Sequence, residues 1–143
     1  MKFEEWEPYY QRILDYFGFG REEDEEAARI LSSLLSRDDF ALLSGMLCNA
    51  EVIVAGNAPS LPADIKNTDF SGKIVIAADA AARVLKKGGV TPQIVFTDLD
   101  GLDDDVLEMN AEGTLLAVHA HGDNIPLVKS WVPKMQGPVV GTT

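Results

Sequence analysis

Short runs of β-branched and aliphatic residues alternate with longer, more polar segments through the C-terminal part of the chain. The runs lack the in/out alternation of a half-exposed strand, which is typical of strands buried on both faces of a parallel sheet. The pattern therefore predicts strands over residues 52–55, 73–77, 93–96, 114–118 and 138–140. It predicts crossover helices over residues 80–87, 102–110 and 124–131. We expect an α/β fold with a Rossmann-like, three-layer, mostly parallel sheet.

Residues 1–50 have a helical pattern instead. Apolar side chains recur at spacings of three and four between Trp6 and Phe17 and are followed by glycines, which predicts a first helix. Further helices are predicted over residues 22–36 and 38–47. The acidic run 22–26 is interpreted as a solvated helix start, where the helix dipole favours negative charge.

The chain is expected to consist of an N-terminal helical segment, residues 1–50, and an α/β domain, residues 51–143. Only three residues follow the last predicted strand, so that strand would lack a covering helix. We therefore expect the α/β domain to be incomplete at its C-terminus.

Composition narrows the class of protein. The formal net charge of −11 disfavours binding to nucleic acid or to an anionic membrane surface, so small-molecule partners are expected. Cys48 is the single cysteine, which excludes an intrachain disulfide, and its apolar neighbours predict a buried thiol. No uncharged apolar run approaches the roughly 18 residues of a membrane span, and we expect a cytoplasmic protein.

Polar clusters follow the predicted strands. Because the carboxyl ends of parallel strands share one edge of a sheet, these clusters are expected to lie together, and such an edge normally binds a ligand. The clusters contain Gly56, Asn57, Pro59, Ser60, Asp79, Asp98, Asp100, His119, His121, Asp123 and Asn124.

Asp98 and Asp100 lie two residues apart directly after a buried strand, so both carboxylates can project to the same side. Carboxylate pairs of this kind suit Mg²⁺, which binds through one or two carboxylates plus substrate phosphates. The alternative is that Asp100 or Asp103 caps the following helix. Asp79 repeats the pattern one strand earlier and has the same alternative role as a helix cap.

Residues 56–61 place backbone N–H groups and Pro59 where a helix can begin, which suits anion binding, although a tight turn without a ligand is equally consistent. His119 and His121 are the only histidines. Phosphate contact or proton handling, transition-metal ligation and a structural loop role all stay open for them. Four converging carboxylates would repel a bare triphosphate, so a nucleotide would need a divalent metal.

Four segments together resemble the archaeal MptE-type 6-hydroxymethyl-7,8-dihydropterin pyrophosphokinases and, more distantly, the thiamin pyrophosphokinases. Their order and spacing match as well. The segments are residues 56–61 (GNAPSL), 78–82 (ADAAA), 92–101 (PQIVFTDLDG) and 119–124 (HAHGDN).

This resemblance implies Mg²⁺-dependent transfer of diphosphate from the co-substrate ATP to the hydroxymethyl oxygen of a reduced pterin, releasing AMP, in tetrahydromethanopterin or folate-type cofactor synthesis. It implies that Asp79, Asp98 and Asp100 bind metal and phosphate. His119, His121, Asp123 and Asn124 become further active-site residues, with His121 or Asp123 as the candidate general base. Gly56, Asn57, Pro59 and Ser60 would contact the nucleotide.

Alanines 58 and 80 stand where the family has glycine, Gln93 stands where it has aspartate, and its C-terminal F-T-D-G-D turn is absent. Alternatives remain a thiamin pyrophosphokinase-like activity and a nucleotide- or pterin-binding module without turnover. A haloacid dehalogenase-type phosphatase, with Asp98 as nucleophile and Asp100 as acid/base, is a third, although Leu102 departs from its motif. An open sheet edge is compatible with homo-oligomers.

Overall fold

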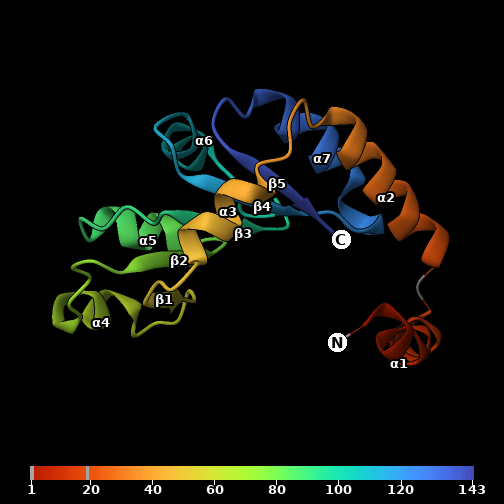
Figure 1. Cartoon of the computed structure of the whole chain (residues 1–143), viewed down its shortest axis with the longest axis horizontal. Helices are drawn as coiled ribbons and strands as arrows, with labels where there is room; N and C mark the ends of the chain where they lie inside the picture. Colours follow the sequence, from red (N-terminus) through yellow and green to blue (C-terminus); the bar gives the residue numbers. More distant parts are fainter. Residues whose placement is uncertain (1, 19) are drawn as a thin grey trace.

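The structure is a computed structural model and describes residues 2–18 and 20–143. Its described part forms five strands, seven α-helices and two 3-10 helices (Figure 1). In chain order they are α1 (Phe3–Phe17), α2 (Arg21–Leu34), α3 (Phe40–Leu47), β1 (Val52–Ala55), α4 (Leu61–Asn67), β2 (Ile74–Ala78), α5 (Ala81–Lys87), β3 (Ile94–Thr97), α6 (Asp104–Ala111), β4 (Leu115–His119), η1 (Gly122–Asn124), α7 (Ile125–Trp131), η2 (Val132–Lys134) and β5 (Val139–Thr142).

The five strands form one parallel sheet in the order β1-β2-β3-β4-β5. Ala55 is paired with Ala77, Ala78 with Phe96, and Thr97 with Val118. Each strand therefore lies beside the next one in the sequence, and all carboxyl ends lie on one edge. The predicted α/β class with a parallel sheet is confirmed, and each predicted strand agrees with an observed one to within two residues at either end.

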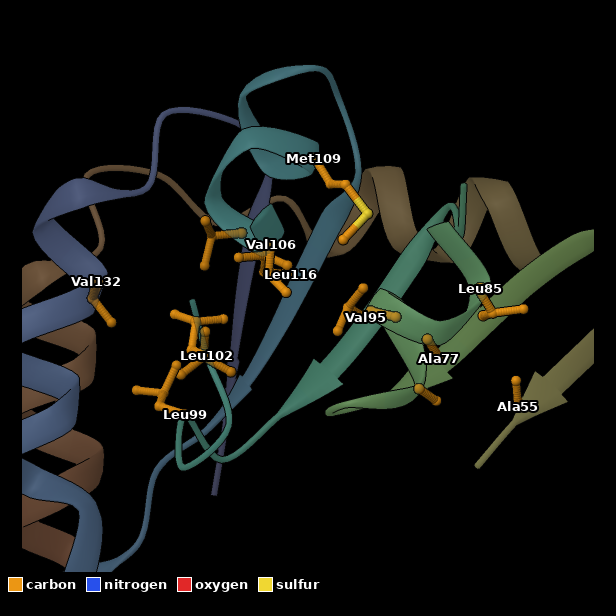
Figure 2. Packing of buried hydrophobic residues seen from close by; sticks show 14 of the residues in the cluster. Ala55, Ala77, Leu85, Val95, Leu99, Leu102, Val106, Met109, Leu116 and Val132 are labelled. Carbon is orange, nitrogen blue, oxygen red and sulfur yellow. The ribbon is translucent and has the colours of Figure 1, made fainter. Parts of the chain in front are cut away.

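Alternate residues of the strands feed two apolar layers. The larger cluster joins one face of the sheet to side chains of α2, α4, α5, α6 and α7, and it includes Val75, Ala77, Val95 and Leu116 (Figure 2). On the opposite face, Leu43 of α3 packs with Ile94, Leu115 and Val140. The result is the three-layer arrangement of helices, sheet and α3 that a parallel sheet needs to bury both faces.

The α3 side of the sheet is less completely covered near β1. Val52, Val54 and Phe96 have the strand parity of this face, and their exposed fractions are 40%, 71% and 40%. The larger cluster, by contrast, contains side chains that are almost fully buried, such as Leu85 and Met109. The two faces therefore differ in how well they exclude water.

Helix α2 packs along α7, η1 and β5, whereas α1 lies at the margin of the molecule beneath α2 in Figure 1. Leu14 of α1 is 3% exposed, but Tyr9, Tyr16 and Phe17 are largely exposed. The amphipathic pattern of α1 therefore predicted the helix correctly but overstated how much of its apolar face is buried. Gly18 ends the helix at a φ of 70°, a conformation that glycine adopts without steric cost.

Two features differ from the sequence prediction. No helix range was predicted for α4, although Pro59 was noted where a helix can begin, because its seven residues include a proline and show no long apolar period. Leu61 and Ile65 anchor this helix in the larger cluster. Cys48 was predicted to be buried but is exposed, because the chain leaves α3 there and turns away from the apolar layer. Among the described residues, no helix is long and apolar enough to cross a membrane.

Candidate functional site

The predicted site residues do lie along the carboxyl edge of the sheet. Gly56 follows β1, Asp79 follows β2, Asp98 follows β3 and His119 ends β4, so they stand in strand order along that edge. Neighbouring strands are about 4.8 Å apart, which places the β1 and β4 ends roughly 14 Å from each other. A ligand that touches both ends must therefore be elongated.

The turn after β3 presents its two acids on either side of a buried leucine. Leu99 is 1% exposed and has a φ of 77°, which is unusual for a branched side chain and costs roughly 1–3 kcal/mol. Its N–H donates to Oγ1 of Thr97 (2.9 Å), and the N–H of Asp100 donates to Oδ1 of Asp98 (3.1 Å). Figure 2 shows Leu99 in the apolar cluster. This anchor holds the strained turn and leaves Asp98 and Asp100 at the edge of the sheet.

Asp103, and not Asp100, caps the helix that follows. Its Oδ1 accepts from the N–H of Val106 (3.2 Å), and its Oδ2 accepts from Arg83 (2.9 Å). The capping role that was an alternative for Asp100 is therefore filled by its neighbour. Both acids of the β3 turn remain candidates for ligand contact.

Asp79 is the most unusual residue of the edge. Its φ is 45°, its N–H donates to the carbonyl of Phe96 (2.8 Å), and its Oδ1 is buried without a hydrogen-bond partner among the described residues. The cap position of α5 belongs to Ala80, which has the helical φ of −59°, and no side chain caps it. A buried, unpartnered carboxylate oxygen costs about 1–3 kcal/mol or more. Asp79 therefore does not act as the cap of α5, and its role as a metal ligand stays a prediction.

These carboxylates do not form a closed metal cage. Within the part of the chain that the structure describes, no three His, Cys, Asp or Glu side chains are grouped closely enough to hold a metal ion. A cation beside Asp79 would therefore take most of its ligands from water and phosphate. That donor set fits Mg²⁺, which usually binds through one or two carboxylates together with substrate phosphates.

Asn124 joins the β3 and β4 ends of the edge. The side chain is 2% exposed, and its Nδ2 donates to the carbonyls of Asp98 (2.7 Å) and His119 (2.8 Å). Its Oδ1 accepts from the N–H of His121 (3.0 Å). Because these bonds use both amide protons, Asn124 acts on the site by positioning the loops that carry the acids and the histidines.

The two histidines and Asp123 lie at the end of β4 and in the loop after it, which Asn124 joins to the acidic turn. His119 is exposed, His121 is partly buried, and their ring centroids are 6.1 Å apart. Asp123 is exposed in the short helix η1. His119 and Asp123 are thus accessible to solvent and His121 is partly so, as proton handling or phosphate contact would require, and the choice between those roles stays a prediction.

The loop after β1 is held mainly by its own backbone. The N–H of Ala58 donates to the carbonyl of Gly56 (2.9 Å), and the N–H of Leu61 donates to the carbonyl of Ala58 (3.0 Å). Asn57, Pro59 and Ser60 are exposed. The loop is accessible from the edge, and its predicted contact with a nucleotide remains a prediction.

Gln93 lies directly before β3, at the opposite edge of the sheet. Its Oε1 accepts from the N–H of Val75 (2.7 Å), and its Nε2 donates to the carbonyl of Thr91 (3.2 Å). The residue therefore makes structural contacts far from the acids.

Asp24 of α2 reaches the histidine loop, which the sequence did not predict. Its Oδ1 accepts from the N–H of Gly122 (2.9 Å), and its Oδ2 accepts from the hydroxyl of Tyr10 in α1 (2.7 Å). Burial and the hydrogen bond to Asp24 raise the pKa of Tyr10 to about 12. The interpretation of the acidic run as a solvated helix start is therefore wrong for Asp24, although Glu22 and Glu23 are exposed.

Beside this connection lies a partly open cavity of about 500 Å³, between the N-terminal helices and the ends of β4 and β5. Trp6, Tyr10 and Glu25 line one side, and His119 and His121 line the other. Sequence analysis had assigned the aromatic residues to the apolar face of a helix. No local signal marks them as site residues, because their partners lie about a hundred positions later in the chain.

A parallel sheet with carboxylates and histidines along its carboxyl edge is the general architecture of ligand-binding α/β proteins. Residues 26–143 match the family described as "6-hydroxymethylpterin diphosphokinase MptE-like", and the chain belongs to that family. The resemblance found in the sequence motifs is thereby confirmed.

Three relatives carry the name 6-hydroxymethyl-7,8-dihydropterin pyrophosphokinase, which describes a transferase. The chain is 37% identical to the protein of Methanothermobacter thermautotrophicus over 100% of its own length and 62% of the relative. It is 41% identical to that of Pyrococcus furiosus, covering 90% and 58% respectively. It is 32% identical to that of Methanocaldococcus jannaschii, covering 99% and 62%. The chain thus spans about 60% of the length of these relatives.

Proposed function

We propose that this chain provides the active-site edge of a 6-hydroxymethyl-7,8-dihydropterin pyrophosphokinase. The reaction is Mg²⁺-dependent transfer of diphosphate from ATP to the hydroxymethyl oxygen of the reduced pterin, with release of AMP. It would serve tetrahydromethanopterin or folate-type cofactor synthesis in the cytoplasm. Membership of the family and the names of the three relatives support this activity.

The observation that carries the proposal is the unpartnered Oδ1 of Asp79 beside the strained acidic turn. Asp79, Asp98 and Asp100 would hold Mg²⁺, which would neutralise the charge of the phosphate oxygens. Without it, a chain whose formal net charge is −11 offers a triphosphate a repulsive edge.

The chain's own residues have little covalent chemistry to perform. Asn124 fixes the β3 turn relative to the histidine loop, so the acceptor hydroxyl and the β-phosphorus can be held in line. The pterin hydroxyl must lose its proton as the new O–P bond forms. His121 and Asp123 are the proposed acceptors of that proton, since both are accessible from the edge.

The test is an assay with ATP, Mg²⁺ and 6-hydroxymethyl-7,8-dihydropterin that follows AMP separately from ADP and inorganic phosphate. Pterin-dependent AMP that disappears in Asp98→Asn but persists in Asp104→Asn would establish diphosphate transfer at this edge. Asp104 is the matched control, because it is an exposed aspartate in the first turn of α6.

Other outcomes identify the alternatives. Phosphate release without AMP would indicate a phosphatase with a covalent aspartyl-phosphate on Asp98. AMP formed with thiamin in place of the pterin would assign the thiamin activity. Nucleotide or pterin binding without turnover would leave a binding module.

A further inference from the structure

The cavity between α1, α2 and the histidine loop is built like a ligand site. Its volume of about 500 Å³ falls in the range of small-molecule pockets, and aromatic walls with a few converging polar groups are typical of them. Trp6 and Tyr10 supply flat apolar surface on the α1 side. His119 and His121 belong both to this cavity and to the proposed catalytic edge, so a ligand in the cavity would lie next to that edge.

The charges of the cavity favour an uncharged ligand. Asp24 and Glu25 line it together with one cation, Arg21. That guanidinium is already paired with Glu7 and with Oε1 of Glu25, the latter at 3.1 Å. Phosphate groups would therefore meet a net negative wall, and the neutral heterocycle of a substrate is the better fit.

The acceptor oxygens of Glu25 distinguish between the two heterocycles of the proposed reaction, the pterin of the acceptor and the adenine of ATP. Among residues 2–18 and 20–143, Oε1 of Glu25 accepts only from Arg21 and no group donates to Oε2, whereas both oxygens of Asp24 have partners. The Glu25 side chain is 59% exposed, so it is accessible to a ligand. A carboxylate has about four acceptor sites on its two oxygens, so Glu25 can accept from two adjacent N–H donors while Oε1 keeps its bond from Arg21. The 2-amino-4-oxopyrimidine ring of a pterin presents such a pair, while adenine presents a donor beside an acceptor.

We propose that this cavity binds the pterin ring of the acceptor, with Glu25 accepting hydrogen bonds from its amino and ring N–H groups and with Trp6 and Tyr10 packing against the ring. The inference rests on the proposed function. It makes the N-terminal helices the acceptor-binding wall, although residues 1–25 lie outside the matched family region. The nucleotide then occupies the edge from Gly56 to Asp98.

Two ligands test this assignment separately. Binding of 6-hydroxymethylpterin, the stable oxidised form with the same donor edge, is followed by its own fluorescence. Binding of a non-hydrolysable ATP analogue with Mg²⁺ is measured by calorimetry. Both are titrated into the wild-type chain, into Glu25→Gln and into Glu26→Gln, because Glu26 is the next residue on the same helix, pairs with Arg29 and does not line the cavity.

Glu25→Gln is expected to weaken pterin binding about 10- to 100-fold through loss of charge-assisted hydrogen bonds, and to leave nucleotide binding within about twofold. Glu26→Gln should change neither. Trp6→Ala provides a second variant that acts through stacking and should also weaken the pterin alone.

The remaining results overturn the inference. If the wild type binds the pterin and both Glu25→Gln and Trp6→Ala bind it equally well, the ring lies elsewhere while the proposed function stands. If these variants weaken the nucleotide instead, the cavity holds the adenine. If the wild type binds nucleotide but no pterin, the proposed function fails and the inference fails with it.

Discussion

The carboxylate of Asp24 accepts a hydrogen bond from the backbone N–H of Gly122 across 98 positions of sequence, at 2.9 Å. The same carboxylate accepts the hydroxyl proton of Tyr10. One side chain thus connects both N-terminal helices to the loop that carries the histidines. Because Gly122 would bring an added Cβ to 2.7 Å from Cβ of Glu23, α2 and this loop are also in close steric contact.

Replacing Asp24 by alanine should lower the free energy of unfolding by about 2 kcal/mol, since two hydrogen bonds to a charged acceptor are lost in a partly buried setting. Urea unfolding measures this loss, and Glu22→Ala on the exposed side of the same helix serves as control. The amide proton of Gly122 should also exchange faster with solvent. Equal stability of the two variants would contradict the structural role of Asp24.

Asn124→Ala should remove about 3 kcal/mol of stability, because two carbonyls and one N–H lose their partner in a buried place. Asn110→Ala is a matched control. Asn110 is also fully buried, and it donates to the carbonyls of Thr114 and Pro138 and accepts from the N–H of Gly137.

The two asparagine variants should be destabilised to a similar degree and differ in function. Only Asn124→Ala is expected to weaken binding of the Mg²⁺–nucleotide, by about tenfold or more, because Asn110 joins strands at the opposite edge. Calorimetric titration at a temperature where both variants are folded distinguishes them. Equal nucleotide affinity in the two variants would remove Asn124 from the site.

Asp79→Asn should abolish the proposed diphosphate transfer while leaving the protein as stable as before, or up to about 1 kcal/mol more stable. The change removes the charge of an unpartnered buried oxygen, and asparagine tolerates the positive φ of 45°. Thermal unfolding with and without Mg²⁺–nucleotide checks both parts. A destabilisation above about 1 kcal/mol would mean that Asp79 has a structural partner.

The pKa of Tyr10 gives a prediction for alkaline pH. Burial, assisted by the hydrogen bond to Asp24, raises this pKa from 10.0 to about 12. The stability that Tyr10 contributes is therefore complete below pH 10 and is lost as the pH rises through about 12. Ultraviolet titration of tyrosinate should show a late step that is absent in Tyr10→Phe and shifted to lower pH in Asp24→Asn; a late step that persists in Tyr10→Phe would assign it to another tyrosine.

The strands and the acidic edge could be predicted because their signals are local. Ile94, Val95 and Phe96 form an apolar run, and the Asp-x-Asp-Gly turn follows it directly, so the parallel sheet brings the turn to the edge without further information. The same local logic indicated helix-capping by an acid after β3, and the structure identifies Asp103 as that cap.

The cavity could not be predicted, because its walls meet only in three dimensions. Nothing near Asp24 in the sequence distinguishes it from the solvated acids beside it, and the hydrogen bond that does so comes from Gly122. Asp79 is similar: its position was predicted, but the positive φ and the orphaned oxygen depend on the neighbouring strand. Helix α4 was missed since packing, rather than periodicity, stabilises it.

The sequential order of the strands has a consequence for biosynthesis. Each strand pairs with the one made just before it, so the sheet can grow in the order of translation. Helix α2 is made before the sheet, but it packs on α7, η1 and β5, which are made after the first four strands. At a translation rate of 5–20 residues per second, the 98 positions between Asp24 and Gly122 correspond to roughly 5–20 s between the synthesis of the two residues. During this time α2 lacks the elements on which it packs. The cavity therefore closes only after the β3 turn has been made, and a nascent chain acquires its acidic edge before it acquires this cavity.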